Sequence, residues 1–274
     1  PIFLLLSLLL PKKIKKKFII ELNGFGFDVS IGLKRYLSSI VALIYDFLLR
    51  PFGKIVAVNN SIKERLSINN KNKTIIVENG GPILDNRKPN KSSNINKLDF
   101  IFYGAFNPYI NLSHIFKAFD LLEKDKYVFK LNIIGFGPEL DKLKKLCLPR
   151  DWATYIGPKD YDNFKNFVFE YPNNLVALIP MGIRYGSSDL KPIKLFEYLS
   201  VCLPIIYADC VASDIFEDNV NGFKYKTGDS YSFYSSLKRS IENKDKINSL
   251  IEKNKTLYSS MTWDSRMKKF LEEL

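Results

Sequence analysis

The sequence contains little cysteine and almost no histidine. Its 274 residues include three cysteines, Cys147, Cys202 and Cys210, and one histidine. An odd number of cysteines without a CxxC pair argues against both a disulfide framework and a zinc site. Buried cysteines usually behave as small apolar residues, and we interpret these three in that way. The composition therefore favours a reducing, cytoplasmic setting.

The apolar run that opens the chain is also short. IFLLLSLLL has nine residues, whereas a membrane-spanning helix needs about 20. Its positive charge, PKKIKKK, follows the run, whereas in a secretory signal the charge precedes it. We interpret the run as a core element of a domain whose start is missing, and an interfacial membrane anchor is the alternative. Because residue 1 is proline, we expect the chain to begin inside a longer reading frame or after processing.

Positive charge, in contrast, is abundant. Lysine and arginine number 41 against 29 acidic residues, which gives a net charge of +12 and a pI near 9.4. Such a chain attracts nucleic acid, anionic lipid or phosphorylated small molecules. Nucleic acid is the least favoured, because the sequence has no RNP-like aromatic pattern, helix-turn-helix or zinc spacing. The lysine run at 12–17 is typical of a solvated surface, and anionic lipid binding is its alternative.

The length and the 46% hydrophobic content suit two domains. Short apolar runs alternate with helical periodicity, which predicts a doubly wound α/β protein. A polar stretch at 78–97, rich in Gly, Pro, Asn and Ser, predicts the domain boundary. Strands are expected at 18–22, 54–58, 74–77, 99–104, 130–135, 153–157, 174–180, 203–209 and 222–225. Helices are expected at 31–49, 111–124, 138–146, 160–171, 192–201, 211–217, 230–242, 244–258 and 263–273.

The stretch KPIKLFEYLSVCLPIIYAD at 191–209 places a carboxylate, Glu197, among apolar residues of an expected helix. Pro192 suits the first turn of that helix, and the small residues of GSSDLK before it have amides that can face an anion. Ligands of open parallel sheets bind at the carboxyl ends of the strands, and this loop follows the strand at 174–180. Asp189 and Glu197, eight positions apart, could both contact a ligand that carries a phosphate and a polyol.

These residues also have simpler interpretations. Glu197 could be a solvated residue that pairs with Lys194 or Lys191. Asp189 could cap its helix. The two glycines of IIGFGPEL, at 135 and 137, could serve only the turn between strand and helix.

The order of the motifs NGG, NIIGFGPEL, YIG, ALIP, KPIKLFEYL, LPII, NGF and TWDSRMKKFLEEL resembles that of GT-B glycosyltransferases. The similarity is to the family-4-like enzymes that build bacterial surface polysaccharides, and it covers residue 99 to the end well and 18–90 more loosely. The resemblance implies two Rossmann-like doubly wound domains, the first incomplete because the chain is truncated at its N-terminus. Residues 1–90 would be the remnant of the acceptor-side domain and 91–258 the nucleotide-sugar domain. Residues 259–274 would form a helix that packs back toward the first domain.

The donor-site signature of these enzymes is an acidic residue, seven intervening residues and a glutamate, matched here by Asp189 and Glu197. By resemblance both are catalytic-site residues: Glu197 would accept hydrogen bonds from the two ribose hydroxyls, and Asp189 would lie near the sugar and diphosphate. Lys194 would supply charge for the phosphates. The donor-binding residues implied in all are Gly104, Gly135, Gly137, Tyr155, Gly157, Arg184, Ser187, Ser188, Lys191, Lys194 and Glu197.

The chain departs from the family pattern at several positions. Aspartate replaces the usual glutamate at 189, and Cys202 stands where a glycine is common, so its side chain is strained if φ is positive. FYGAFNPYINLSH at 102–114 offers no Arg or Lys for the diphosphate, so Lys191, Lys194 or Arg184 would have to substitute. The acceptor-domain glycine-rich loop and histidine have no counterpart. We expect the single histidine, His114, to be an ordinary helix-start residue.

The resemblance implies transfer of a hexose from a nucleotide sugar to a lipid-linked or other saccharide, in capsule, O-antigen or exopolysaccharide synthesis at the cytoplasmic face of the membrane. It also implies retention of anomeric configuration and no metal or other cofactor, because backbone amides and the helix dipole hold the diphosphate. The expected partners are the donor, the acceptor and an anionic membrane surface, without nucleic acid. The alternative is a non-catalytic GT-B remnant that binds nucleotide or a partner transferase.

Overall fold

The computed structural model describes residues 10–23, 33–85, 98–182 and 190–273. These residues form two compact units. The chain passes from the first unit to the second between Asn79 and Gly80, inside the polar stretch at 78–97. It leaves the second unit after Ser265, within the last helix, α12 (Trp263–Glu272). The opening run IFLLLSLLL lies outside the described residues except for its last leucine.

The first unit contains a three-stranded parallel sheet in the order β1-β2-β3. The predicted strands at 18–22, 54–58 and 74–77 are confirmed to within one residue. The strands are β1 (Ile19–Leu22), β2 (Lys54–Ala57) and β3 (Thr74–Ile76), and the helices of this unit are α2 (Lys12–Lys15), α3 (Leu33–Leu49), α4 (Asn60–Glu64) and α5 (Ile68–Lys71). A small apolar core of Leu49, Phe52, Ile55 and Leu66 joins helix and sheet.

The end of α3 is closed by a lysine from a distant part of the chain. The Lys73 ammonium donates to the carbonyl oxygens of Leu49, Arg50 and Phe52, at 2.8, 2.9 and 2.8 Å. Leu49 is the last residue of α3, where a helix leaves carbonyls without intrahelical partners, and Arg50 and Phe52 lie in the loop that follows. Lys15, within the run at 12–17, is buried, so the expectation that the whole run is a solvated surface is wrong at this position.

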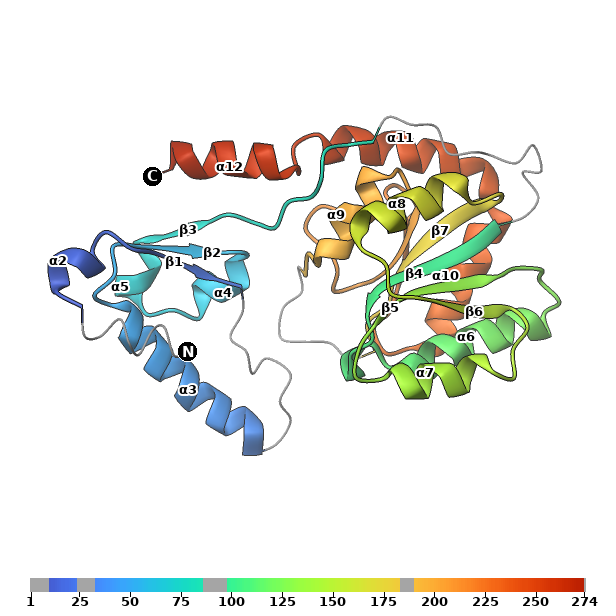
Figure 1. The fold of residues 1–274 in the computed structure, drawn as a ribbon, viewed down its shortest axis with the longest axis horizontal. Coiled ribbons are helices and arrows are strands. Elements are labelled where there is room, and N and C mark those ends of the chain that lie inside the picture. The colour runs from blue at the N-terminus through green and yellow to red at the C-terminus, as the bar shows by residue number, and fades with distance from the viewer. Residues whose placement is uncertain (1–9, 24–32, 86–97, 183–189, 274) are drawn as a thin grey trace. The chain divides into compact units, whose positions relative to one another are not determined.

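The second unit is a doubly wound α/β structure around a six-stranded sheet in the order β6-β5-β4-β7-β8-β9 (Figure 1). All neighbouring strands are parallel, so their carboxyl ends share one edge. The strands are β4 (Leu98–Ala105), β5 (Leu131–Phe136), β6 (Ala153–Gly157), β7 (Asn174–Ile179), β8 (Ile205–Ala208) and β9 (Phe223–Tyr225). The helices are η2 (Pro108–Ile110), α6 (Leu112–Lys124), α7 (Leu140–Cys147), α8 (Tyr161–Glu170), α9 (Ile193–Ser200), α10 (Ser230–Glu242), η3 (Lys244–Lys246) and α11 (Ile247–Tyr258).

The direction in which strands are added reverses at β4. From β4 the chain builds outward to β5 and β6, and it then returns to place β7 on the other side of β4. Figure 1 shows α6 and α7 on one face of this sheet and α8 and α9 on the other. A crevice for ligands opens at such a switch point, outside the carboxyl ends of the strands. The ends of β4 and β7, and the helix α9 that follows β7, therefore define where a ligand site is expected.

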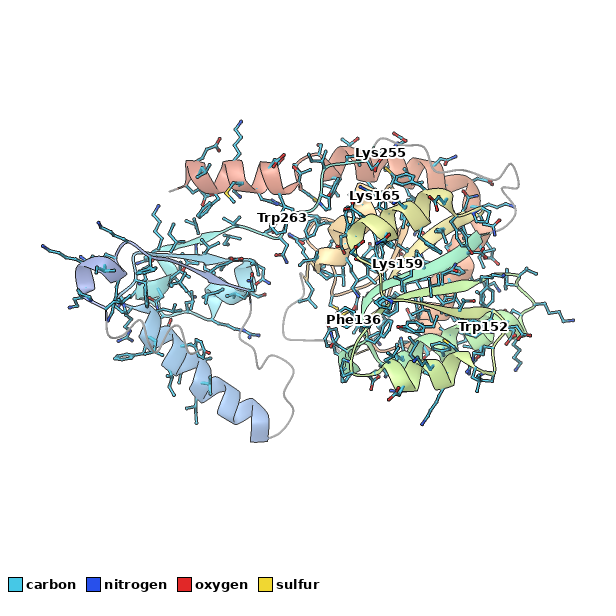
Figure 2. The ribbon with its side chains drawn as sticks, viewed as in Figure 1. Phe136, Trp152, Lys159, Lys165, Lys255 and Trp263 are labelled. Atoms are coloured by element: carbon cyan, nitrogen blue, oxygen red, sulfur yellow. The ribbon has the colours of Figure 1, made fainter. Side chains whose placement is uncertain are left out.

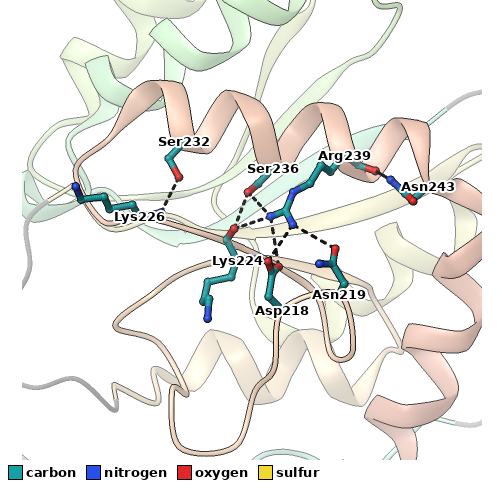
Figure 3. A network of polar contacts seen from close by, with 8 residues as sticks. All are labelled: Asp218, Asn219, Lys224, Lys226, Ser232, Ser236, Arg239 and Asn243. Carbon is teal, nitrogen blue, oxygen red and sulfur yellow. Dashed lines mark hydrogen bonds and ion pairs between the residues drawn. The ribbon is translucent and has the colours of Figure 1, made fainter.

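Polar networks fix the amino-terminal ends of the strands in this sheet, opposite the carboxyl ends. The Asp99 carboxylate, at the start of β4, accepts hydrogen bonds from Lys130 N–H, the Tyr171 hydroxyl and the Asn173 amide at 2.7 to 2.9 Å. At the start of β9, the Arg239 guanidinium bonds Asp218 and the Lys224 carbonyl oxygen (Figure 3). Asn221, of the motif NGF, bonds the backbone N–H of Glu217 and the Asn254 side chain. The described contacts of NGF are therefore structural and lie away from the carboxyl edge.

The helix predicted at 211–217 is wrong. Val211 instead forms an isolated bridge with Leu190, and Ala212 N–H donates to the Leu190 carbonyl oxygen at 2.9 Å. Ala212 also has φ of 49°, a left-handed conformation that ends any right-handed helix. The start of the segment therefore pairs with Leu190, and only a single turn follows, in which the N–H groups of Ile215 and Phe216 donate to the Ala212 carbonyl oxygen.

Candidate functional site at the carboxyl edge of the sheet

The four glycines expected to bind a donor lie at the carboxyl ends of β4, β5 and β6, all with positive φ: Gly104, Gly135, Gly137 and Gly157. A Cβ on Gly135 would overlap the Gly104 carbonyl oxygen, and one on Gly137 would lie 2.5 Å from the Phe106 nitrogen. The close approach of neighbouring backbone segments therefore requires glycine at both positions, whether or not a ligand binds there. Phe136 between them is two-thirds exposed at this edge (Figure 2).

Gly104 has a different neighbour, the side chain of Lys194 from α9. A Cβ on Gly104 would lie 3.0 Å from Lys194 Nζ and 3.1 Å from its Cε. The same ammonium lies 4.7 Å from the centre of the Phe102 ring, within the range of a cation–π contact. The absence of a side chain at 104 thus lets Lys194 place a positive charge at the end of β4, where residues 102–114 have no Arg or Lys of their own.

Glu197 lies one turn further along α9 and is half-buried. Burial raises its pKa, and the charge of Lys194 lowers it. Burial lowers the pKa of Lys194 to about 8, and the charge of Glu197 raises it. No hydrogen bond or ion pair joins either side chain to another described residue. Two desolvated opposite charges at a switch point, neither of them hydrogen-bonded to a side chain of the described residues, are typical of a functional site.

Helix α9 is held against the sheet by Tyr198, whose side chain is fully buried. Its hydroxyl accepts from Tyr103 N–H at 2.8 Å and lies 3.2 Å from the carbonyl oxygens of Leu178 and Tyr103. One hydroxyl thus joins α9 to the ends of β4 and β7. Burial raises the pKa of Tyr198, so the hydroxyl stays neutral.

Tyr103 belongs to the site, although no motif in the sequence singles it out. Its ring stacks on Phe164 with centroids 4.2 Å apart and an interplanar angle of 9°. Burial, and after it the charge of Glu197, raise the pKa of the Tyr103 hydroxyl. Its position at the end of a predicted strand is the only signal in the sequence that could have indicated it.

Of three other predicted residues, Tyr155 and Lys191 have contacts inside the protein, and Gly157 has open space beside its Cα. The Tyr155 hydroxyl donates to the Gly135 carbonyl oxygen at 3.0 Å. Lys191 is buried and forms an ion pair with Asp214 at 2.6 Å. A Cβ on Gly157 would meet nothing within 4 Å. The roles of these residues in donor binding remain predictions, and four more predicted residues lie outside the described residues: Arg184, Ser187, Ser188 and Asp189.

Two further expectations concern single residues. His114 lies in the first turn of α6, as expected, where it is buried and its Nδ1 is 2.8 Å from the Ser230 hydroxyl oxygen. Burial lowers its pKa. Cys202 has φ of 59°, so the turn keeps a left-handed conformation with a side chain in place of glycine.

Within the described residues, no group of three or more His, Cys, Asp or Glu side chains could hold a metal ion. Among the described helices, none has both the length and the apolar character that are needed to cross a bilayer.

This six-stranded parallel sheet, wound in both directions from β4, defines a Rossmann-like α/β domain. The sequence profile of the family described as glycosyl transferases group 1 matches residues 85–257, more than half of the chain, and the protein belongs to this family. No curated protein matches the chain significantly.

Solved GT-B glycosyltransferases have the same fold. HepE of Anabaena, in complex with UDP and glucose, superposes with a TM-score of 0.70 at 14% identity, over 93% of this chain and 71% of that chain. The lipopolysaccharide outer core galactosyltransferase WaaB, in its apo form, gives 0.59 at 18% identity, over 83% and 64%. A TarM variant of S. aureus, in complex with Fondaparinux, alpha-GlcNAc-glycerol and UDP, gives 0.68 at 13% identity, over 93% of this chain and 50% of that chain. The expected α/β, GT-B fold is thereby confirmed.

Proposed function

We propose that this protein transfers a hexose from a nucleotide sugar to a saccharide acceptor, and that the donor binds at the carboxyl edge of the second unit's sheet. The observation that carries the proposal is the pair Lys194 and Glu197, placed by α9 beside the end of β4. HepE has been solved with UDP-glucose, so a uridine nucleotide is the first donor to test.

Each charge of the pair suits one part of such a donor. The Glu197 carboxylate would accept hydrogen bonds from both ribose hydroxyls, a bidentate arrangement in which charge-assisted bonds are strong. The Lys194 ammonium would face the diphosphate. A nearby dianion favours the charged lysine, so donor binding would raise the Lys194 pKa from about 8.

The diphosphate needs further donors of hydrogen bonds, and we propose that backbone amides at the carboxyl edge and the positive end of α9 supply them. In this arrangement no metal or other cofactor takes part. Asp189 would lie near the sugar, and the transfer would retain anomeric configuration. Gly104, Gly135, Gly137, Tyr155, Gly157, Arg184, Ser187, Ser188 and Lys191 complete the proposed donor site.

We further propose that the acceptor is lipid-linked and that the protein works at the inner face of an anionic membrane, in capsule, O-antigen or exopolysaccharide synthesis. Lys12, Lys13, Lys16 and Lys17 are exposed on and after α2. The nearby helix α3 exposes four apolar side chains at spacings of three and four residues: Ile40, Leu43, Ile44 and Phe47. Basic residues near a surface of this kind contribute roughly 1 kcal/mol each to binding of anionic lipid.

These two features belong to one part of the first unit. The Phe18 and Phe52 rings meet edge to face, 6.4 Å apart, and a Cβ on Gly53 would overlap the Lys16 carbonyl oxygen. The end of the lysine run therefore packs against the loop that follows α3. Arg50 lies over the Phe47 ring, at 5.2 Å from its centroid, and adds a charge beside the exposed apolar stripe.

A nucleotide screen followed by a transfer assay tests this function. Thermal shifts with UDP-, GDP- and ADP-sugars should identify one donor class, and Lys194→Met should abolish its shift. Incubation with that labelled donor and a membrane extract should then give labelled saccharide. A shift without transfer would favour the non-catalytic remnant, and no shift with any nucleotide would refute both interpretations.

A further inference from the structure

Helix α9 is supported from behind by two segments that run side by side at the limits of the second unit. Gly81 N–H donates to the Met261 carbonyl oxygen at 3.0 Å, and Trp263 N–H donates to the Gly81 carbonyl oxygen at 2.9 Å. Gly81 and Thr262 form a parallel bridge. We call residues 80–82 and 261–263, which lie at the chain entry and exit of this unit, the paired segments.

Two glycines allow close packing here, Gly80 against the other paired segment and Gly81 against α9. A Cβ on Gly80 would lie 3.0 Å from both the Cα and the nitrogen of Trp263, the residue labelled in Figure 2. A Cβ on Gly81 would lie 2.5 Å from the Phe196 Cβ and 3.3 Å from its carbonyl carbon. Gly81 is therefore in van der Waals contact with α9 itself, at the residue that precedes Glu197.

Further contacts fix the same helix from the same side. The Tyr258 hydroxyl, at the end of α11, donates to the Pro82 carbonyl oxygen, and a Cβ on Gly81 would also overlap that hydroxyl. Asp85 N–H donates to the Ser200 carbonyl oxygen at 2.8 Å, and the Tyr161 and Ser200 hydroxyl oxygens are 2.8 Å apart. Phe196 and Tyr258 are fully buried, so α9 is packed against these segments on this side.

We propose that Gly81 and Tyr258 are positioning residues for the donor site: through Phe196 they fix the depth of α9 in the carboxyl edge, and with it the placement of Lys194 and Glu197 against β4. This inference rests on the proposed function only for its link to the donor, because the placement of Lys194 can be measured without ligand. Neither residue is assigned to touch the donor.

The physical argument is that neighbouring residues of a helix move together. Phe196 precedes Glu197 directly, and Lys194 lies two residues before Phe196, so a displacement of Phe196 is passed to both charges. Lys194 is confined by the Phe102 ring and by the missing side chain at Gly104. A shift of α9 by a fraction of an ångström would take the ammonium out of this position and toward water. Misplacement of binding groups by about 1 Å can cost a hundredfold in an enzyme's rate.

The test compares two glycines that are equally crowded. Gly81→Ala would push on Phe196, whereas Gly222→Ala would push on the Ile205 carbonyl oxygen at the opposite edge of the same sheet. Both should destabilise the protein to a similar extent, as thermal unfolding would show. Tyr258→Phe keeps the ring and removes only the hydroxyl that donates to the Pro82 carbonyl oxygen, so it is a third, milder variant.

The first readout is the titration of the Lys194 ammonium in ligand-free protein, followed by 13C NMR of its Cε and assigned by comparison with Lys194→Met. Gly81→Ala should move the Lys194 pKa upward from about 8 toward the ordinary lysine value, and Gly222→Ala should leave it unchanged. The charge of Glu197 acts on Lys194 and also on Tyr103, and the titrations of both groups would be followed in the same experiment.

The second readout is affinity for UDP at pH 7 by calorimetry. Gly81→Ala should raise the Kd at least tenfold, Tyr258→Phe about threefold, and Gly222→Ala less than twofold. Equal effects of the two alanine variants on the Lys194 titration would overturn the inference. If Gly81→Ala does not fold, an unchanged Lys194 titration in folded Tyr258→Phe would overturn it instead. If the wild type does not bind UDP or any other nucleotide, the proposed function fails, whereas the titration still decides the positioning role.

Discussion

Replacing Glu197 by glutamine removes one charge and almost no volume. In the proposed site this carboxylate accepts two ribose hydroxyls, and glutamine keeps one oxygen but loses the charge. Hydrogen bonds to charged groups contribute about 1.5 to 3 kcal/mol. At about 1.36 kcal/mol for each factor of ten, Glu197→Gln should weaken donor binding roughly 10- to 150-fold.

The same substitution should not destabilise the fold. Burial raises the pKa of Glu197 in the folded state above its value in the unfolded state. At pH values between these two pKa values, the folded state therefore binds more protons than the unfolded state. Stability is therefore lost across that window as pH rises, because burial of the charge is a net cost that Lys194 only partly offsets. Glutamine does not ionise and escapes this cost. We expect the Tm of Glu197→Gln at pH 7 to equal or exceed that of the wild type.

The assay combines calorimetry with the cognate nucleotide sugar and thermal unfolding without it. Glu252→Gln is the matched control, because Glu252 also lies on a helix beside a lysine, Lys255, at 2.8 Å, but on α11 and exposed. The control should keep donor affinity within twofold. Unchanged affinity of Glu197→Gln together with a lower Tm would mean that Glu197 is structural, and the donor site would have to lie elsewhere.

Three further predictions follow from described contacts. Donor affinity should fall as pH rises from 7 to 9, because Lys194 loses its proton near 8. The contribution of Lys194 to the unfolding free energy should rise over the same window, because the unfolded lysine stays protonated to about 10.4. Lys194→Met should remove the first pH dependence in calorimetry and the second in urea titrations. Tyr198→Phe should lower the unfolding free energy by about 1 to 3 kcal/mol, because the Tyr103 N–H loses its partner. As a control, Tyr231→Phe, at an exposed position, should change the unfolding free energy by less than about 0.5 kcal/mol. Glutamine at the four exposed lysines of the run at 12–17 should abolish salt-sensitive binding to vesicles with anionic lipid, and binding that persists would refute the proposed surface. The control replaces four other exposed lysines by glutamine: Lys117, Lys124, Lys145 and Lys253.

Much of the fold could be predicted because its strands are parallel and buried on both faces. Such strands appear as continuous apolar runs, and Val176, Ala177 and Leu178 of β7 are fully buried, as their run indicates. All nine predicted strands occur, with ends shifted by at most two residues. The periodic helices were equally clear. The errors lie where pairing is not local, as at 211–217, where a bridge to Leu190 replaces the expected helix.

Short helices were also missed, for a related reason. Helix α4 has five residues, fewer than any periodicity can indicate, and depends on its N-cap, because the Asn59 side chain accepts from Ile62 N–H at 2.9 Å. Helix α5 has four residues and is held from outside, since the Asn70 amide donates to the Asp46 carboxylate at 2.8 Å. Neither helix has a face long enough to produce a hydrophobic pattern.

The candidate site shows most clearly what a sequence pattern leaves open. KPIK contains two lysines three positions apart, and either could supply the charge that residues 102–114 lack. In the structure Lys191 pairs with Asp214, which lies 23 residues later and after another strand, and Lys194 extends over Phe102 to the end of β4 because position 104 has no side chain. Both choices depend on residues brought close by the sheet order rather than by the chain. The motif therefore indicates a cation near the switch point, and of its two lysines the packing of β4 against α9 brings Lys194 there.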